Sequence, residues 1–185
     1  MPAHLFREHK WREDVVSIGE VSAAFVSEVS QGRVNEPWPA QLNKMVVNGG
    51  HDLILSIGQV VPHEVVGMAN YTKNMLIGTG GKANIDLTHF IGAVHGMERM
   101  MGHTDTPVRR ILNHAWETFA GGLPCVFVLT VVGRVGRDTV TRGLFIGDTH
   151  DVFERAAALA REVVPIPRAC NRFVTPAPPP PTRST

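Results

Sequence analysis

Apolar residues recur along the chain at two spacings, one typical of helices and the other of strands. Recurrence at every third or fourth position predicts helices. These helices cover residues 20–30, 40–50, 88–101, 107–119 and 150–163. Short apolar runs predict a buried strand over residues 52–58 and a β-hairpin, in which residues 124–132 and 138–146 flank a glycine turn.

Residues with special backbone preferences mark the boundaries of these elements. A Pro-Trp-Pro run at 37–39 predicts a stiff break, and an Asn-Gly-Gly run at 48–50 ends the short helix. Thr88 is expected to cap one helix, and Pro107 suits the first turn of the next. Residues 59–86 are rich in loop-forming residues. The alternation of strands and helices predicts an α/β fold, a mixed sheet with flanking helices.

The composition fits one globular domain followed by a different kind of segment. The chain has 185 residues, of which 43% are hydrophobic and 19% charged, and a formal net charge of +1. This is enough for a soluble domain with a substantial core. Seven of the thirteen prolines lie from Pro165 onward. We therefore expect a folded domain over residues 1–164 and a disordered, proline-rich tail over residues 165–185.

The same sequence disfavours several classes of protein. Its apolar runs are far shorter than the roughly 20 residues of a membrane helix, and its charged first residues lack the apolar core of a signal peptide. Two cysteines make neither a disulfide framework nor a zinc cluster, so we expect a cytoplasmic protein with Cys125 in its core. A near-zero net charge argues against nucleic-acid binding.

Glycine and histidine are concentrated in residues 57–102, which hold eight of the eighteen glycines and three of the nine histidines. Glycine-rich loops bring backbone close to a ligand, and histidine supplies acid, base or metal-ligand chemistry near neutral pH. His63, just past the predicted buried strand, is either a general acid or base or an exposed loop residue. Lys73 is either a solvated surface group or, if desolvated, a nucleophilic amine.

His89 lies at the start of a predicted helix and shares a face with Gly92 and Gly96. Small neighbours leave room beside the imidazole, which suits a cofactor or metal ligand, because nickel accepts imidazole well. The alternative is an ordinary polar residue in the first helical turn. The glycine-rich run at 78–81 is either a phosphate cradle or a tight turn.

Two arginines, Arg109 and Arg110, stand at the start of the predicted helix 107–119. They oppose the helix dipole, so they are either partners of an anion or a surface pair, and a surface pair is the simpler interpretation. Asp148 is expected to cap the last helix.

These residues together resemble the active-site stretch of the nickel-dependent lactate racemase family. The stretch in this chain reads VVPHEVVGMANYTKNMLIGTGG, followed by IDLTHFIGAVHGMER. The family has a proline-histidine pair, a lysine ten residues later and a histidine sixteen residues after that, which fall here on His63, Lys73 and His89. Residues 68–71 are Met-Ala-Asn-Tyr, where typical members have a run like Phe-Ser-Gly-Gly. A weaker resemblance extends from about residue 9 to about residue 163.

The resemblance implies a fold, a cofactor and a reaction. The fold would be part of the larger N-terminal domain of a two-domain racemase. Lys73 would carry a covalently tethered nickel pincer nucleotide, His89 would bind its nickel, and His63 would be one of two histidines that move the hydroxyl proton. The substrate, a small 2-hydroxy acid, would pass a hydride from Cα to the cofactor, leaving a 2-keto acid. Return of the hydride to the other face would invert the stereocentre.

Departures from the family pattern leave alternatives open. Members are about twice as long, and they have a second domain and an upstream partner histidine that this chain lacks. We therefore expect a partial catalytic domain over residues 1–164 and a partner chain that supplies the missing regions. The alternatives are an inactive remnant, a subunit that needs its partner, and a sugar-acid epimerase of the same family. A plain nickel-binding module ranks last, because scattered histidines are poor evidence for a metal site.

Overall fold

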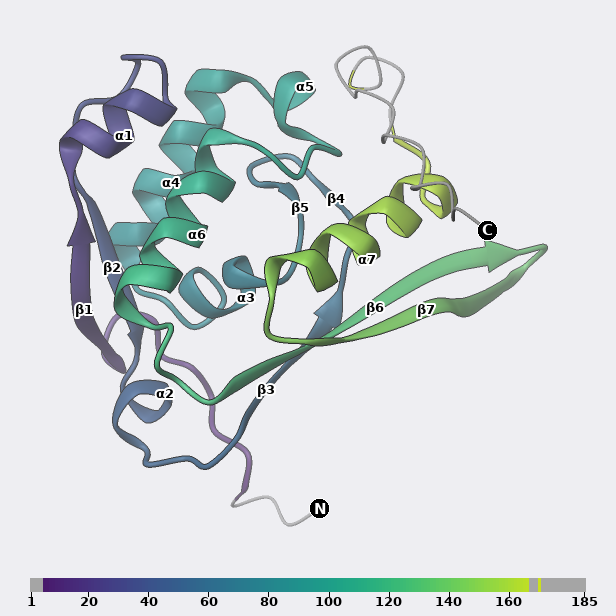
Figure 1. The fold of residues 1–185 in the computed structure, drawn as a ribbon, viewed down its shortest axis with the longest axis horizontal. Coiled ribbons are helices and arrows are strands. Elements are labelled where there is room, and N and C mark those ends of the chain that lie inside the picture. Colours follow the sequence, from purple (N-terminus) through teal and green to yellow (C-terminus); the bar gives the residue numbers. More distant parts are fainter. Residues whose placement is uncertain (1–4, 167–169, 171–185) are drawn as a thin grey trace, which may run out of the picture.

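Strands and helices alternate from residue 15 to residue 163 in the computed structural model, which describes residues 5–166 and residue 170 (Figure 1). The strands are β1 (Val15–Val21), β2 (Trp38–Asn43), β3 (Ile54–Gln59), β4 (Pro62–His63), β5 (Gly67–Met68), β6 (Cys125–Val135) and β7 (Asp138–Gly147). The helices are α1 (Ala23–Val29), α2 (Lys44–Asn48), α3 (Thr72–Leu76), α4 (Lys82–His95), α5 (Met97–Met100), α6 (Pro107–Phe119) and α7 (His150–Val163). Most of the predicted tail, residues 165–185, lies outside the described residues.

The main sheet has three strands in the order β3-β6-β7. Strand β3 pairs with β6 in parallel, and β6 pairs with β7 antiparallel, so the sheet is mixed as the sequence predicts. Helices α3 to α6 make the crossover between β3 and β6, and α7 packs on β6 and β7. The expected α/β fold, a mixed sheet with flanking helices, is therefore confirmed.

A second, two-stranded sheet includes the first four residues of the helix that the sequence predicts over residues 40–50. Strand β1 pairs antiparallel with β2, and only residues 44–48 are helical. The Pro-Trp-Pro run forms no break, because Trp38 and Pro39 begin the strand. Burial alternates along β2, with Trp38, Ala40 and Leu42 all in the core. The predicted helix is therefore confirmed over residues 44–48, where Gly49 caps it, and wrong over residues 40–43, where the spacing of two was missed.

Helix α4 starts earlier than the sequence predicts, and this changes the role of Thr88. The helix begins at Lys82, where Gly81 donates its N–H to the side chain of Asn84 at 2.8 Å. Thr88 therefore lies within the helix and does not cap it. Its buried hydroxyl accepts a hydrogen bond of 2.9 Å from the indole N–H of Trp38. That contact joins α4 to the two-stranded sheet.

Among the described residues, the three-stranded sheet is covered on one face only. Its inner face, which α7 and the aromatic core cover, contains Phe127, Leu129 and Val131. Its outer face carries large apolar side chains that are more than half exposed. These are Leu55 at 52%, Ile57 at 66%, Leu144 at 58% and Ile146 at 59%. The buried strand predicted over residues 52–58 exists as β3, but only one of its faces is buried.

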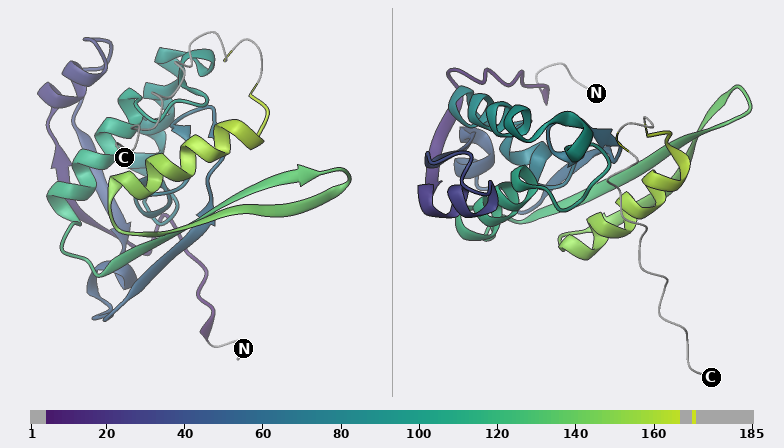
Figure 2. Two further views of the ribbon diagram at one scale, coloured as in Figure 1. Left: turned by 45° about the vertical axis from the view of Figure 1, so that its right-hand side comes forward. Right: turned by 90° about the horizontal axis from the view of Figure 1, so that it is seen from above.

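The β6–β7 hairpin extends beyond the rest of the molecule. Figure 2 shows its tip projecting past α7 in both views. The tip carries the predicted glycine turn, with Gly136 at a φ of 62°. All described helices are too short or too polar to cross a membrane.

Candidate functional site

Three residues singled out in the sequence, His63, Lys73 and His89, line one small cavity of about 60 Å³. They come from β4, α3 and α4, which all lie between β3 and β6 in the chain (Figure 1). The other residues that line the cavity are Val65, Val66, Ile77 and Thr88. The fold thus brings together residues that are ten and sixteen positions apart in the sequence.

A tight hairpin between β4 and β5 places His63 in this cavity. His63 pairs with Gly67 in the antiparallel ladder. Gly67 has a φ of 89°, and a Cβ there would collide with the backbone oxygen of His103. Only glycine permits both this conformation and this close approach. Part of the segment predicted as loop therefore has strand structure, which directs the imidazole inward.

Hydrogen bonds define the neutral form of His63. The N–H of Val65 donates to His63 Nδ1 at 3.1 Å, so the neutral ring carries its proton on Nε2. Burial lowers the pKa of His63 below its ordinary value, and the charge of Lys73 lowers it further. The carboxylate of Glu64, 3.7 Å from Nδ1, partly opposes both effects on that pKa. His63 is therefore a neutral imidazole at pH 7, and not a freely exposed loop residue.

Lys73 is half-buried, and its amine is easier to deprotonate than that of an ordinary lysine. Burial lowers the pKa of Lys73, the charge of Arg109 lowers it further, and the carboxylate of Glu64 opposes them. The expectation of a solvated surface group is therefore wrong. A desolvated amine next to another cation is the environment in which lysine becomes nucleophilic.

His89 lies at the exposed rim of the cavity. Its Nδ1 lies 2.8 Å from the backbone oxygen of Ile85, and because a carbonyl only accepts, Nδ1 carries the proton of the neutral ring. The lone pair of Nε2 is then available, and no group in the described part of the chain contacts it. A second nitrogen fixed on a backbone carbonyl is the usual arrangement of a histidine that binds a metal.

The glycines around His89 act differently from the sequence prediction. Gly92 makes room for the loop at Val65, because a Cβ there would lie 2.9 Å from Val65 Cγ1. Gly96 lies beyond the end of α4 with a φ of 90°, so it does not share that face. The run at 78–81 forms a turn between α3 and α4, and the amide of Gly81 is already used by Asn84. The tight-turn interpretation is the one that the structure supports.

Arg109 differs most from the sequence-based expectation. The surface pair is half right, because Arg110 lies at the surface and binds Asp105, with Nε 2.5 Å from Oδ1. Arg109, by contrast, is 1% exposed and lies against the segment that precedes Lys73. A signal was present in the helical spacing, since Arg109 falls on the same face as Leu112 and Trp116, which are buried.

Asp148 and Cys125 were also singled out in the sequence, as a helix cap and as a core residue. Asp148 does not cap α7, whose N-cap is Thr149 without a side-chain hydrogen bond. The backbone oxygen of Asp148 instead accepts a hydrogen bond from the Tyr71 hydroxyl at 3.4 Å. Cys125 is a free, buried cysteine, as expected, and burial raises its pKa to about 11.

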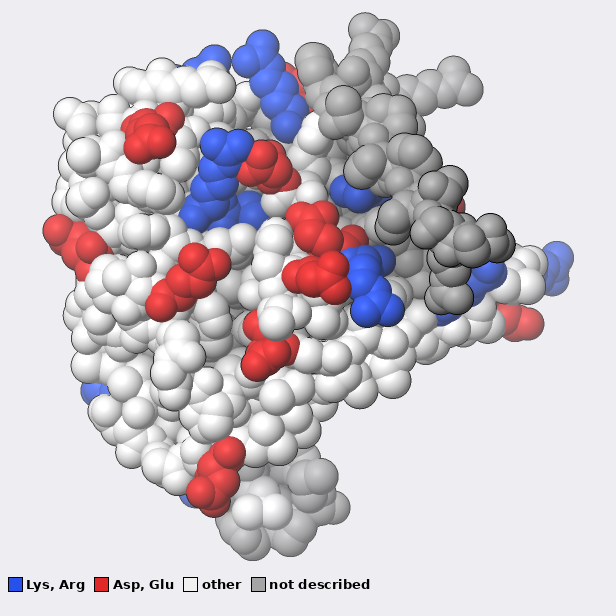
Figure 3. Space-filling view, viewed as in Figure 1, with Lys and Arg blue, Asp and Glu red and all other residues white. Residues whose placement is uncertain are grey.

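On one face of the described part of the molecule, the charged side chains do not gather into a patch of a single sign. Figure 3 shows acidic and basic side chains of both signs together in the band between α6 and α7. In residues 5–166 and 170, no group of three or more histidine, cysteine, aspartate or glutamate side chains is arranged to hold a metal ion. Any metal bound at the cavity would therefore take fewer than three such side chains from this part of the chain.

Comparisons with solved structures show where this fold recurs. A Thermotoga maritima protein solved by structural genomics matches 90% of this chain, with a TM-score of 0.71 and 25% sequence identity. The lactate racemase apoprotein of Thermoanaerobacterium thermosaccharolyticum matches 84%, with a TM-score of 0.55 and 15% identity. This chain spans 38% of the first protein and 33% of the second. Neither protein-family models nor curated protein sequences give a match. The chain thus has the fold of part of a lactate racemase.

Proposed function

We propose that this chain carries catalytic residues of a 2-hydroxy-acid racemase or epimerase related to lactate racemase. The observation that carries the proposal is the single cavity lined by His63, Lys73 and His89. The resemblance to the family selects these three residues by their spacing in the sequence alone. The fold independently brings their side chains to one cavity. The shared fold with a lactate racemase apoprotein adds support. The substrate would be a small 2-hydroxy acid, and a sugar acid is the alternative.

The residues of the cavity fit a nickel pincer nucleotide, the cofactor that the resemblance implies. Lys73 offers a half-buried amine with a lowered pKa, which suits covalent attachment. His89 offers the free lone pair of Nε2, and nickel accepts imidazole readily. Complete ligand sites measure about 300–1,000 Å³. The cavity of about 60 Å³ would therefore enclose only the reactive end of the cofactor.

The chain's own residues would position the reactants and move a proton. When bound, the nickel pincer nucleotide supplies a site that accepts a hydride from the substrate carbon and returns it. In the form described, His63 can donate a hydrogen bond from Nε2 to the substrate oxygen. To act as a base through Nε2, the neutral ring must instead carry its proton on Nδ1, which leaves the lone pair of Nε2 free to accept the substrate proton. This form is favoured if Nδ1 exchanges its partner, the Val65 amide, for the nearby Glu64 carboxylate, because a carboxylate accepts a hydrogen bond from Nδ1.

The proposal is tested by mass spectrometry of protein made together with the proteins that build the cofactor. An adduct on Lys73 together with bound nickel is the expected result. The adduct should vanish in Lys73→Arg and persist in Lys82→Arg, a matched control at an exposed lysine nearby. An unmodified Lys73 in cells that load a known lactate racemase would overturn the proposal.

Two further variants separate the roles of the histidines. His89→Ala should keep the adduct on Lys73 and lose nickel, because His89 would bind only the metal. His63→Gln should keep both the adduct and nickel and lose turnover. Nickel retained in His89→Ala, or turnover retained in His63→Gln, would refute the corresponding role.

A subunit that needs a partner is a second candidate, because the chain spans only 38% and 33% of the two solved proteins. In that case the chain alone would not racemise lactate or sugar acids. Activity should return when the remaining regions of a related racemase are supplied as a separate chain. Turnover by the isolated chain would exclude this candidate. If the mixture of the two chains also fails to racemise lactate and sugar acids, an inactive remnant is favoured.

A further inference from the structure

Arg109 is a fully buried cation without a carboxylate partner. Its exposed fraction is 1%, and no carboxylate lies within ion-pair distance of it in the described ranges 5–166 and 170. Burial lowers its pKa to about 9, so the guanidinium is still protonated at neutral pH. The ring of Phe153 faces its Cζ at 4.4 Å and offsets part of the burial cost. Since burying a charge is costly, such a group needs a structural reason.

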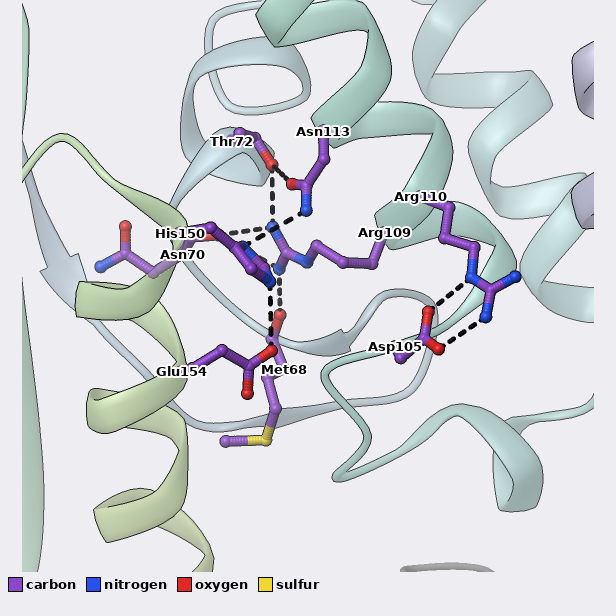
Figure 4. Close-up of polar contacts among 9 residues, drawn as sticks. All are labelled: Met68, Asn70, Thr72, Asp105, Arg109, Arg110, Asn113, His150 and Glu154. Atoms are coloured by element: carbon purple, nitrogen blue, oxygen red, sulfur yellow. Dashed lines mark hydrogen bonds and ion pairs between the residues drawn. The ribbon is translucent and has the colours of Figure 1, made fainter. Parts of the chain in front are cut away.

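The guanidinium fork binds the backbone just before Lys73, as Figure 4 shows. Nη2 donates to the backbone oxygen of Met68 at 2.5 Å and to that of Asn70 at 3.2 Å. Nη1 donates to the Asn70 oxygen at 3.2 Å and to Thr72 Oγ1 at 2.9 Å. Arg110, one residue further along the helix, turns outward to Asp105. Arg109 therefore donates hydrogen bonds to three acceptors within residues 68–72.

The bound backbone is strained. Asn70 has a φ of 72° and Tyr71 a φ of 59°, a region that residues with a side chain rarely adopt. Two consecutive residues of this kind cost of order 1–3 kcal/mol each and persist only where neighbours hold them. Asn70 Oδ1 accepts the Tyr71 N–H at 2.7 Å, which supports the bend locally. Helix α3, with Lys73 in its first turn, starts directly after it.

One face of α6 holds the whole of this segment, residues 66–72, which we call the clamped segment. Thr106 donates to the backbone oxygen of Val66 at 3.1 Å, and Asn113 accepts from the Thr72 hydroxyl at 2.8 Å. Arg109 lies between them, three residues after Thr106 and four before Asn113, which is the spacing of one helical face. The three side chains thus fix the two ends and the middle of the clamped segment.

We propose that Arg109 is the positioning residue for Lys73: it holds the clamped segment in its strained conformation and so fixes where the lysine amine enters the cavity with His63 and His89. The reason for positioning Lys73 rests on the proposed function, whereas the placement of Arg109 against the clamped segment rests on the hydrogen bonds alone. A second effect follows from the same placement. The charge of Arg109 lowers the pKa of Lys73, after burial and against Glu64. Position and reactivity of the lysine would then depend on one side chain.

Titration of the lysines tests this in protein without cofactor. The chain has four lysines, Lys10, Lys44, Lys73 and Lys82, so ¹³C-dimethylation gives few lysine signals to follow by NMR. The signal of Lys73, assigned with Lys73→Arg, should titrate at lower pH than the other three. In Arg109→Met it should move toward them. Amide exchange within residues 68–73 should also speed up about tenfold or more, while exchange in the β6–β7 hairpin stays unchanged.

Two variants give the test its controls. Arg109→Lys keeps the charge and loses the fork, so exchange in residues 68–73 should rise while Lys73 still titrates low. Arg110→Met, at the exposed neighbour, should change neither reading. If Arg109→Met fails to fold, Arg109→Lys and Thr72→Val, which removes one contact, provide the exchange measurement. A Lys73 that titrates with the other lysines, or exchange unaltered in every Arg109 variant, would overturn the proposal.

Failure here and failure of the proposed function are distinguishable. An Arg109-dependent Lys73 without any cofactor adduct would leave this inference standing and remove the racemase proposal. An adduct on Lys73 that forms equally in wild type and Arg109→Lys, with unaltered amide exchange, would do the reverse.

Discussion

The clamped segment and the three-stranded sheet are opposite kinds of structure. The clamped segment has little regular backbone pairing, yet its residues Val66, Met68, Asn70 and Thr72 are buried. Side chains of Thr106 and Arg109, at the start of α6, bind the backbone oxygens of Val66, Met68 and Asn70. The sheet has continuous ladders from β3 through β6 to β7, yet one of its faces carries exposed apolar side chains. Regular hydrogen bonding and burial are therefore separate in this protein.

The difference indicates where chemistry can be positioned. A buried irregular backbone must have every polar group satisfied, so a small number of side chains determines its shape. Those constraints act on His63, which shortly precedes the clamped segment, and on Lys73, which directly follows it. The outer face of the sheet, by contrast, carries Ile57, Val128 and Ile146 side by side in register, and no titratable group among them. The candidate site lies where the backbone is strained and not where it is regular.

The largest effect is expected at Phe127, which joins the two regions. Its ring lies 4.5 Å from that of Tyr71 and 5.6 Å from that of Trp116. Phe127→Ala should lower the free energy of unfolding by about 3–5 kcal/mol, measured by chemical denaturation. Ile146→Thr, on the outer face of the same sheet, should change it by about 0.5 kcal/mol or less. Equal losses at both positions would contradict the distinction between the two faces.

A smaller effect should separate two substitutions of Asn70. Asn70→Ala loses the hydrogen bond to the Tyr71 amide and places a Cβ without polar compensation in the left-handed region. It should destabilise the protein by about 1–3 kcal/mol. Asn70→Gly loses the same bond and relieves the strain, so it should cost about 1 kcal/mol less than alanine. If alanine proves the better replacement, the segment is not strained as described.

The pH dependence of stability near neutral pH should come from buried and half-buried histidines that lie outside the three-stranded sheet. The lowered pKa values of His63, His95 and His103 mean that the folded protein takes up these protons less readily than the unfolded chain. Stability should therefore be unaffected by them above the ordinary histidine pKa of 6.5 and should fall as pH drops below it. Denaturation at pH 7.5 and 5.5 should show a smaller loss in His63→Gln. Ile57→Thr should keep the wild-type loss.

The smallest effect is expected for Asp105→Asn. The pair with Arg110 is exposed on both sides, so solvent screens it, and its removal should cost less than about 1 kcal/mol. Thermal unfolding at low and high salt checks this, since the wild-type contribution should shrink with added salt. A loss as large as that for Asn70→Ala would show that the outer arginine also holds the clamped segment.

Hydrophobic spacing predicted the α/β class, the hairpin and the helices α6 and α7 closely. These elements follow from local rules, since one apolar face recurs at a fixed period and glycine or proline marks the ends. The spacing failed at β2 and at the start of α4. At β2 a short alternating run was hidden by two prolines, and at α4 the helix begins in a polar turn capped through Asn84.

The candidate residues His63, Lys73 and His89 were identified from the sequence because their spacing matched a family pattern. Their physical state was not predictable, because the pKa of Lys73 depends on burial and on a residue thirty-six positions away. The same holds for His63, whose tautomer depends on the amide of Val65. The sequence by itself determined which residues are the candidates for the chemistry, and the period of the elements around them. Only the tertiary structure decided that Arg109 is buried against the clamped segment, because desolvation and hydrogen-bond geometry are properties of packed atoms and not of sequence order.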